Sequence, residues 1–399
     1  MKLVLEDGSE YTGQGFGARG VVAGEVVFNT AMAGYVETLT DPSYRGQILV
    51  TTYPLIGNYG VPGPRAAETI DRPYESSRIQ VQGLIVQTYV DRYSHHAAKR
   101  SLGEWMGSEG IPGVTGIDTR TLTRKLREHG TMKGWLFPAE LGIERARQDA
   151  KSVEMERELF HLVAPRDVIR YDAGASASAK VNANVNANVN VNANAEANVN
   201  VNVNRGSGGL KILVVDTGAK DNIIRSLLKR GVSVIRAPWH GPIRALAQEA
   251  DGVLLTNGPG DPKHLVSLID EVRALLASYT KPIFGICLGN QILALAAGAD
   301  TYKLPYGHRS VNQPVQDLLT RRSFMTSQNH GYAVRDSSLP PGWEPWFVNI
   351  NDGTNEGIRC RAKPFSSVQF HPEACPGPED TGFLFDDFLR LVGAHSRSV

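Results

Sequence analysis

The sequence has few cysteines, no long apolar run and almost no net charge. Its three cysteines are too few and too far from CxxC spacing for a disulfide framework or a zinc site. No apolar run approaches the roughly 18 residues that a membrane-spanning helix needs. The sequence has 42 basic and 41 acidic side chains and no long run of either sign, so no run of basic residues is present that would attract nucleic acid or an anionic membrane. These absences predict a cytoplasmic protein with free thiols, no metal site, no nucleic-acid partner and no membrane association.

The length and one change of composition divide the chain. A chain of 399 residues is long for one hydrophobic core. From Val181 to Asn204 the sequence is almost entirely valine, asparagine and alanine in alternation, and glycines and a serine follow. Asparagine and alanine are poor strand formers, and the segment has no aromatic residue for a core. We therefore predict a first domain of residues 1–171, a flexible linker of residues 172–209 and a second domain of residues 210–399.

The first domain contains a glycine pattern that imitates a phosphate-binding loop. Short valine-rich runs at residues 2–6 and 21–28 predict strands separated by glycine-rich turns. The stretch from Gly15 to Gly20 satisfies the GxGxxG pattern. A dinucleotide loop must open a helix, whereas a valine-rich strand follows here. We therefore predict a β-rich α+β domain without a phosphate site.

Other polar residues of the first domain suggest local structure. Ser43 follows Asp-Pro and is expected to form a turn. Asp118 is expected to cap a helix whose Leu122 and Leu126 share one face, which leaves its basic residues in solvent. The adjacent histidines at 95–96 resemble the start of a surface helix and have no other ligand at metal-binding spacing.

Strands and helices alternate after residue 209. Apolar runs at 210–216, 232–236, 250–255 and just before Cys287 predict strands, and residues 222–230 and 264–278 predict helices. This order is typical of a parallel sheet covered on both faces, in which ligands bind at the carboxyl ends of the strands. The chain is thus expected to be an α/β protein, with a mainly parallel open sheet in its second domain.

Cys287 lies between an apolar strand and a helix-favouring segment. Gly285 and Gly289 flank it, and glycine allows a sharp turn without a Cβ clash. The helix start directs unpaired N–H groups and the positive end of the helix dipole at the sulfur, which favours the thiolate. A buried structural cysteine can follow a strand in the same way. The nucleophile interpretation therefore requires a base elsewhere in the domain.

A histidine at another strand end supplies a candidate base. His264 and His308 have sequence contexts typical of surface residues. His371 instead ends the strand-like run Ser366–Phe370, and Glu373 follows two residues later. A nucleophilic cysteine uses a histidine that a third group orients. We predict that Cys287, His371 and Glu373 lie together.

These motifs resemble a known family. The stretches 285–291, 370–373 and 257–262 resemble the nucleophile, base and oxyanion segments of the class I (triad) glutamine amidotransferases. The front half, with residues 28–35, 40–44, 53–58, 116–120 and 130–134, resembles the small, glutaminase subunit of carbamoyl-phosphate synthase. The segments 218–223, 327–332 and 372–378 do so as well, and the resemblance covers nearly the whole chain except the linker.

The resemblance implies a reaction and a partner. The chain would hydrolyse L-glutamine to glutamate and ammonia, and deliver the ammonia to a large synthetase subunit in a heterodimer or a higher assembly. The large subunit would use ATP, bicarbonate and Mg to make carbamoyl phosphate for arginine and pyrimidine synthesis. The sequence has no P-loop pattern, so no cofactor is expected in this chain.

The resemblance also assigns roles to residues. Cys287 would be the nucleophile, His371 the general base and acid, and Glu373 the group that orients His371. The residues implied in glutamine binding are Ser43, Gly258, Gly260, Leu288, Gln291, Asn329, Gly331 and Tyr332.

The sequence departs from the family pattern at two positions. Asn290 replaces a histidine that is usual after the nucleophile motif, which predicts an altered rate or coupling. Cys375 replaces a small residue four positions after His371. A second thiol near the site and a structural loop residue are both compatible with this position, and the structural role is favoured.

Two other functions are compatible with parts of the sequence. The glutaminase of another synthase, such as the anthranilate or guanylate enzymes, would share the chemistry but lack the front domain. A subunit that only docks on a synthetase would not need Cys287, His371 and Glu373.

Overall fold

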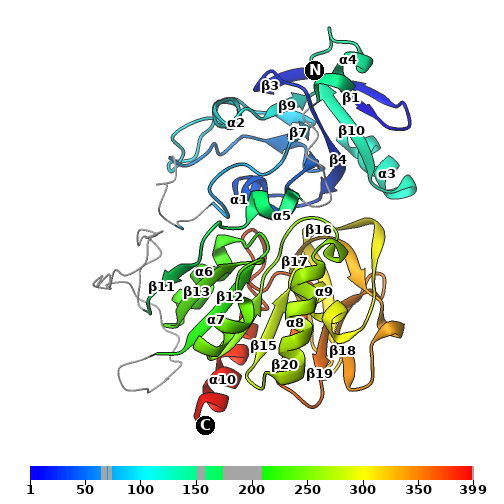
Figure 1. The fold of residues 1–399 in the computed structure, drawn as a ribbon. Helices are drawn as coiled ribbons and strands as arrows, with labels where there is room; N and C mark the ends of the chain where they lie inside the picture. The colour runs from blue at the N-terminus through cyan, green and yellow to red at the C-terminus, as the bar shows by residue number, and fades with distance from the viewer. Residues whose placement is uncertain (64–69, 71–73, 151–157, 174–208, 398–399) are drawn as a thin grey trace. The chain divides into compact units, whose positions relative to one another are not determined.

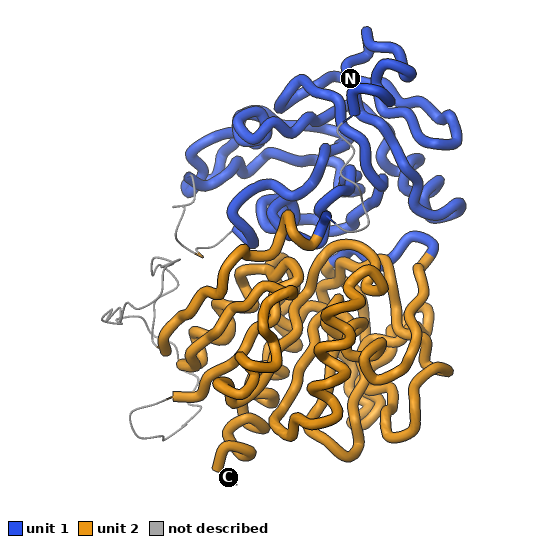
Figure 2. Tube along the Cα trace, viewed as in Figure 1, with its two compact units in different colours: residues 1–65, 73–159, 305–310 blue, residues 66–72, 160–304, 311–399 orange. Residues whose placement is uncertain are grey.

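The computed structural model describes residues 1–63, 70, 74–150, 158–173 and 209–397. The chain forms two compact units (Figure 2): unit 1 contains residues 1–65, 73–159 and 305–310, and unit 2 contains residues 66–72, 160–304 and 311–399. The predicted Val/Asn linker lies mostly outside the described residues, so the linker and the domain boundaries stay predictions. No helix in the described ranges is both long and apolar enough to cross a membrane.

Unit 1 is built on a β-rich mixed sheet (Figure 1). Its strand order is β2-β1-β10-β4-β5-β7-β9-β3, in which β4, β5, β7 and β9 run parallel and the outer pairs are antiparallel. The strands are β1 (Lys2–Leu5), β2 (Glu10–Thr12), β3 (Gln14–Gly17), β4 (Val22–Asn29), β5 (Gln47–Thr51), β7 (Gly83–Val86), β9 (Pro112–Thr115) and β10 (Met132–Phe137). A separate short pair consists of β6 (Leu55–Ile56) and β8 (Thr88–Tyr89). The helices are α1 (Tyr35–Thr40), α2 (Leu102–Ser108), α3 (Thr119–His129) and α4 (Ile143–Asp149).

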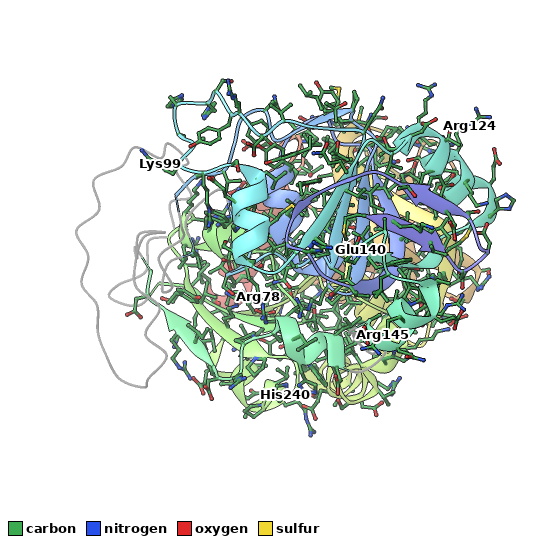
Figure 3. The ribbon with its side chains drawn as sticks, turned by 90° about the horizontal axis from the view of Figure 1, so that it is seen from above. Arg78, Lys99, Arg124, Glu140, Arg145 and His240 are labelled. Atoms are coloured by element: carbon green, nitrogen blue, oxygen red, sulfur yellow. The ribbon has the colours of Figure 1, made fainter. Side chains whose placement is uncertain are left out.

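Local signals of unit 1 mostly behave as predicted. Asp118 caps α3 by accepting a hydrogen bond from the Thr121 N–H at 2.9 Å, and Leu122 is buried. The basic residues of α3 lie mainly in solvent, as Figure 3 shows for Arg124. The predicted helix start at residues 95–96 is wrong. Both histidines are exposed in a loop, because the capping box of Ser101 and Glu104 starts α2 later in the chain.

Unit 2 contains a parallel sheet with an antiparallel extension. The order is β11-β13-β12-β14-β15-β20-β19-β18-β16-β17, and the five strands from β13 to β20 run parallel. These are β12 (Lys211–Asp216), β13 (Ser233–Pro238), β14 (Gly252–Leu255), β15 (Ile283–Ile286) and β20 (Phe365–Val368). The others are β11 (Ile169–Tyr171), β16 (Thr301–Asp317), β17 (Ser323–Val334), β18 (Trp343–Asn349) and β19 (Asn355–Cys360).

Helices cover both faces of the parallel strands, as the alternation of elements predicts (Figure 1). The two apolar layers separate cleanly, because successive residues along each strand point to opposite faces. Residues of α6 (Asp221–Leu228) and α10 (Phe383–Arg397) pack on one face. Residues of α7 (Ile243–Glu249), α8 (Val266–Ser278) and α9 (Leu288–Ala297) pack on the other. The strands β12, β14, β15 and β20 all end at one edge, where the functional residues follow them.

Candidate active site

The turn between β15 and α9 holds Cys287 in a strained conformation. Its backbone has φ 55° and ψ −104°, a region that residues other than glycine rarely adopt. The Cys287 N–H donates to the Val368 carbonyl at 2.8 Å, which ties the turn to the end of β20. Leu288 is the first residue of α9, so the unpaired N–H groups of the first helical turn lie beside the cysteine. The predicted strand, turn and helix are confirmed.

The flanking glycines make room for the turn by their lack of a side chain. Neither Gly285 nor Gly289 has a positive φ, because the strain falls on Cys287 itself. A Cβ at Gly289 would lie 2.3 Å from the Leu255 carbonyl oxygen, and one at Gly285 would lie 2.6 Å from the Gly289 carbonyl oxygen. The glycines therefore allow α9 to approach β14 and β15 closely.

His371 and Glu373 form a buried pair just after β20. The two side chains are almost fully buried, and His371 Nδ1 lies 2.6 Å from Glu373 Oε1. Burial lowers the pKa of His371, but the Glu373 carboxylate and the Cys287 sulfur raise it more, from 6.5 to about 10. Burial likewise raises the pKa of Glu373, and His371 and Lys220 together bring it below its ordinary value.

The reactive side chains of Cys287 and His371 lie near each other and are both buried. The Cys287 sulfur is near enough to raise the pKa of the His371 imidazole, although His371 Nε2 has no hydrogen-bond partner among the described residues. Since Nδ1 is held by Glu373, Nε2 is the nitrogen left for proton transfer. The Cys287 sulfur also lies 3.7 Å from the Asn329 carbonyl oxygen. The structure thus brings Cys287, His371 and Glu373 together, as the sequence predicts.

Two further buried residues hold the loop that carries Glu373. Lys220 Nζ lies 3.3 Å from Glu373 Oε1 and also donates to the Ala374 carbonyl. The Asn222 side chain donates to the Glu373 carbonyl. Sequence reasoning assigned neither residue a role. Their position in the sequence could have indicated a role, because they follow β12, whose carboxyl end lies at the same edge of the sheet as Cys287 and His371.

The segment 257–262 after β14 approaches the start of α9. A Cβ at Gly258 would lie 2.3 Å from the Thr217 carbonyl oxygen and 2.8 Å from a methyl carbon of Leu288, so only glycine fits. Gly260 has φ 79° and needs glycine for its conformation. The Lys220 N–H donates to Asn257 Oδ1 at 3.0 Å, which fixes this segment to the loop after β12. Gly258 and Leu288 are therefore neighbours.

The remaining predicted binding residues lie in α9, in β17 and in unit 1. Asn329, Gly331 and Tyr332 belong to β17, and Nε2 of Gln291 in α9 donates to the Tyr332 carbonyl at 2.9 Å. Ser43 belongs to unit 1, where its N–H donates to Asp41 Oδ1 at 2.9 Å in a buried turn. The predicted turn is confirmed, and the part of Ser43 in glutamine binding stays a prediction.

The two histidines rejected as bases differ from each other. His264 ends a short 3-10 helix (Pro262–His264) and is half-buried. His308 is buried within β16, so its prediction as a surface residue is wrong. The residues around His308 resemble a turn, but β16 continues through them as a 17-residue strand, and this strand buries His308.

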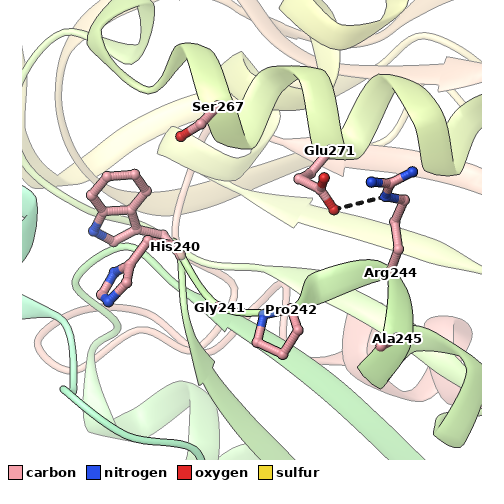
Figure 4. Close-up of a pocket in the computed structure, with 8 residues that line it drawn as sticks. His240, Gly241, Pro242, Arg244, Ala245, Ser267 and Glu271 are labelled. Carbon is pink, nitrogen blue, oxygen red and sulfur yellow. Dashed lines mark hydrogen bonds and ion pairs between the residues drawn. The ribbon is translucent and has the colours of Figure 1, made fainter.

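A cavity of about 520 Å³ lies at the end of β13 beside α7 and α8, away from Cys287 (Figure 4). Burial, with a smaller contribution from His161, lowers the pKa of His240 on its wall. Arg244 Nε and Glu271 Oε2 form an ion pair there at 3.0 Å. The cavity contains no cysteine and so lacks the nucleophile. Its lining residues are Trp239, His240, Gly241, Pro242, Arg244, Ala245, Ser267 and Glu271.

Comparison with known proteins covers both units. Residues 3–136 match the family described as carbamoyl-phosphate synthase small chain, CPSase domain, and residues 213–391 match glutamine amidotransferase class-I. The chain is 43% identical to the carbamoyl phosphate synthase arginine-specific small chain of Emericella nidulans, over 99% of this chain and 80% of the relative. The corresponding protein of Schizosaccharomyces pombe is also 43% identical, over 99% of this chain and 88% of the relative.

A larger protein contains a similar region. The multifunctional protein URA2 of Saccharomyces cerevisiae is 44% identical over 98% of this chain, which spans 17% of the length of that relative. The resemblance seen in the sequence is thus confirmed: the chain belongs to the carbamoyl-phosphate synthase small-chain family, and its second half is a class I glutamine amidotransferase domain.

Proposed function

We propose that the chain is the glutamine-hydrolysing subunit of a carbamoyl-phosphate synthase. It would convert L-glutamine to glutamate and ammonia and pass the ammonia to a large synthetase subunit. The observation that carries the proposal is the buried group of Cys287, His371 and Glu373 at a strained strand-to-helix turn. The membership of the family and the names of its arginine-specific relatives support it.

The first half of the reaction uses the cysteine as a nucleophile. The Cys287 thiolate attacks the side-chain amide carbon of glutamine, and the carbonyl becomes a tetrahedral oxyanion. The N–H groups of Leu288 and Gly258 would donate to this oxyanion, and one such donor contributes about 2.7–4 kcal/mol to catalysis. The imidazolium of His371 then gives its Nε2 proton to the leaving nitrogen, the C–N bond breaks, and ammonia and a thioester remain.

The second half regenerates the enzyme. The neutral His371 takes a proton from water, the resulting hydroxide attacks the thioester carbon, and glutamate leaves as the C–S bond breaks. Glu373 holds His371 Nδ1 and stabilises the imidazolium throughout. Because Glu373 is itself paired with Lys220, its negative charge is retained in the buried site.

Substrate binding and partners follow the family resemblance. Glutamine would contact Ser43, Gly258, Gly260, Leu288, Gln291, Asn329, Gly331 and Tyr332. The large subunit would bind ATP, bicarbonate and Mg, and its carbamoyl phosphate would serve arginine and pyrimidine synthesis. The three free cysteines suit a reducing compartment such as the cytoplasm.

Replacing the nucleophile tests the proposal. In a complex reconstituted with a large subunit, Cys287→Ser should abolish glutamine-dependent carbamoyl phosphate synthesis and leave ammonia-dependent synthesis intact. Loss of both activities in a folded complex would make Cys287 structural. Unchanged glutamine-dependent synthesis would contradict the proposed nucleophile, and absence of glutamine hydrolysis by the unchanged complex would favour a docking role.

A further inference from the structure

Asn290 lies in a buried network of side-chain amides on the first turn of α9. It is fully buried, its Nδ2 donates to Gln369 Oε1 at 3.1 Å, and the Ser367 hydroxyl donates to its Oδ1 at 2.8 Å. Ser367 is in β20 and Gln369 follows that strand, so the network joins α9 to the strand that leads to His371. Asn290 is therefore held from both ends of its carboxamide.

The network has a single direction of hydrogen bonding. Gln369 Oε1 accepts from Asn290 Nδ2 and also from Gln291 Nε2, each at 3.1 Å. Reversing the Gln369 carboxamide would place its NH₂ group against two other NH₂ groups. In the observed orientation Gln369 Nε2 is buried without a partner among the described residues. An unpaired buried donor costs free energy, so the two donors to Oε1 must outweigh that cost.

The direction of the network fixes what Gln291 can offer a ligand. One hydrogen of Gln291 Nε2 is directed to Gln369 Oε1 and the other to the Tyr332 carbonyl at 2.9 Å. Both N–H groups are thus used inside the protein. The carboxamide oxygen Oε1 is the atom that Gln291 can present, and it accepts hydrogen bonds.

We propose that Asn290 is a positioning residue for glutamine binding, which acts through Gln369 to keep the Gln291 carboxamide oxygen turned toward the substrate. The inference rests on the proposed function, because it takes Gln291 as a binding residue. Asn290 lies at the position where the family motif usually has a histidine. A side chain that donates a hydrogen bond to Gln369 Oε1 is sufficient for the proposed role. It acts without touching the substrate or the Cys287 sulfur.

The isosteric variant Asn290→Asp reverses the network. The new carboxylate oxygen would face Gln369 Oε1, which favours a flipped Gln369 and in turn a flipped Gln291 that presents NH₂. We expect the KM for glutamine to rise about tenfold, equivalent to one lost hydrogen bond of about 1.4 kcal/mol, while kcat changes less than about threefold. The rate of Cys287 alkylation by iodoacetamide should stay unchanged, because that reagent does not use Gln291.

Three variants separate positioning from general damage. Asn290→His keeps a donor to Gln369 and should give a KM closer to that of the unchanged chain than Asn290→Asp does. Ser367→Ala frees the Asn290 carboxamide without burying a charge and should raise KM by a smaller factor, even where Asn290→Asp does not fold. Asn355→Asp changes another buried asparagine of unit 2 and should leave KM unchanged.

A double-variant cycle tests the route through Gln369. The KM effects of Asn290→Asp and Gln369→Ala should combine to less than their product, because both disrupt the same contact with Gln291. Unchanged KM in folded Asn290→Asp, a fall in kcat alone, or fully multiplicative effects would each overturn the inference. If the unchanged complex hydrolyses glutamine in those cases, the proposed function survives. If it does not, the proposed function itself fails.

Discussion

Two stretches of the chain, residues 15–20 and 285–289, both contain closely spaced glycines but lead into different elements. In unit 1, β3 ends at Gly17 and the chain continues into the strand β4. In unit 2, β15 is followed by Cys287 and the helix α9, whose unpaired N–H groups lie beside the sulfur. Spaced glycines therefore have chemical meaning only through the element that they open.

The two stretches also differ in how tightly they are packed. A Cβ added at Gly20 would have no other atom within 4 Å. A Cβ added at Gly289 would lie 2.3 Å from the backbone oxygen of Leu255 in β14. A backbone atom cannot move aside as a flexible side chain can. Substitutions at these two glycines should therefore have opposite outcomes.

The largest effect is expected from Gly289→Ala. Its methyl group would collide with the Leu255 carbonyl, so α9 and the Cys287 turn must shift. We expect the free energy of unfolding to fall by about 3 kcal/mol, the upper end for overpacked interiors, together with a loss of glutamine hydrolysis. Denaturant unfolding and a glutaminase assay measure the two effects. Unchanged stability and activity would show that the close approach of α9 to β14 is unnecessary.

An effect of intermediate size is expected when the stability of the chain and of His371→Asn is measured over a range of pH. The pKa of His371 is raised from 6.5 to about 10, so its ionic stabilisation is fully present below about pH 6.5 and is lost as pH rises toward 10. The pKa of Glu373 is lowered, so its contribution is lost at acidic pH instead. The stability advantage of the unchanged chain over His371→Asn should shrink between pH 6.5 and 10.

A histidine with the opposite pKa shift provides the control for this series. Burial lowers the pKa of His240, so this side chain is neutral in both the folded and the unfolded state well above pH 6.5. The stability difference between the unchanged chain and His240→Asn should not vary between pH 8 and 10, a range taken from the ordinary histidine pKa of about 6.5. An advantage over His371→Asn that stays constant to pH 10 would contradict the buried ion pair.

The smallest effect is expected from Gly20→Ala in the first stretch. Its backbone φ is not in the left-handed region and its surroundings are open, so stability should change by less than about 0.5 kcal/mol. Glutamine hydrolysis should also be unchanged, because no phosphate or substrate role is assigned to this loop. A large loss of activity in this variant would mean that the first stretch has a function that its structure does not suggest.

Much of the site could be predicted from the ends of strands. Cys287 directly follows β15, and His371 lies three residues beyond the end of β20. Parallel strands bring their carboxyl ends to one edge. The contacts of Lys220 and Asn222 with residues 373–374 could not be predicted, because they join parts of the chain about 150 residues apart. No periodicity or spacing encodes such a contact.

Local sequence patterns did not predict the secondary structure correctly where pairing between distant strands determines it. The sequence around His308 has turn residues, yet strand pairing keeps it within β16. The antiparallel extension of the second sheet was also not predicted, because its strands lack the regular alternation with helices. The role of the glycines beside Cys287 required the observed distances to β14, which no sequence pattern contains.

Covalent labelling tests whether Cys287 is the nucleophile of glutamine hydrolysis. An electrophilic glutamine analogue is directed by the substrate site, so it should modify one cysteine of the folded complex, and glutamine should protect that cysteine. Peptide mapping should place the label on Cys287, and His371→Asn should slow the labelling. A label on Cys375 or Cys360, or a folded complex that hydrolyses glutamine while Cys287 stays unmodified, would contradict the assignment of Cys287 as the nucleophile.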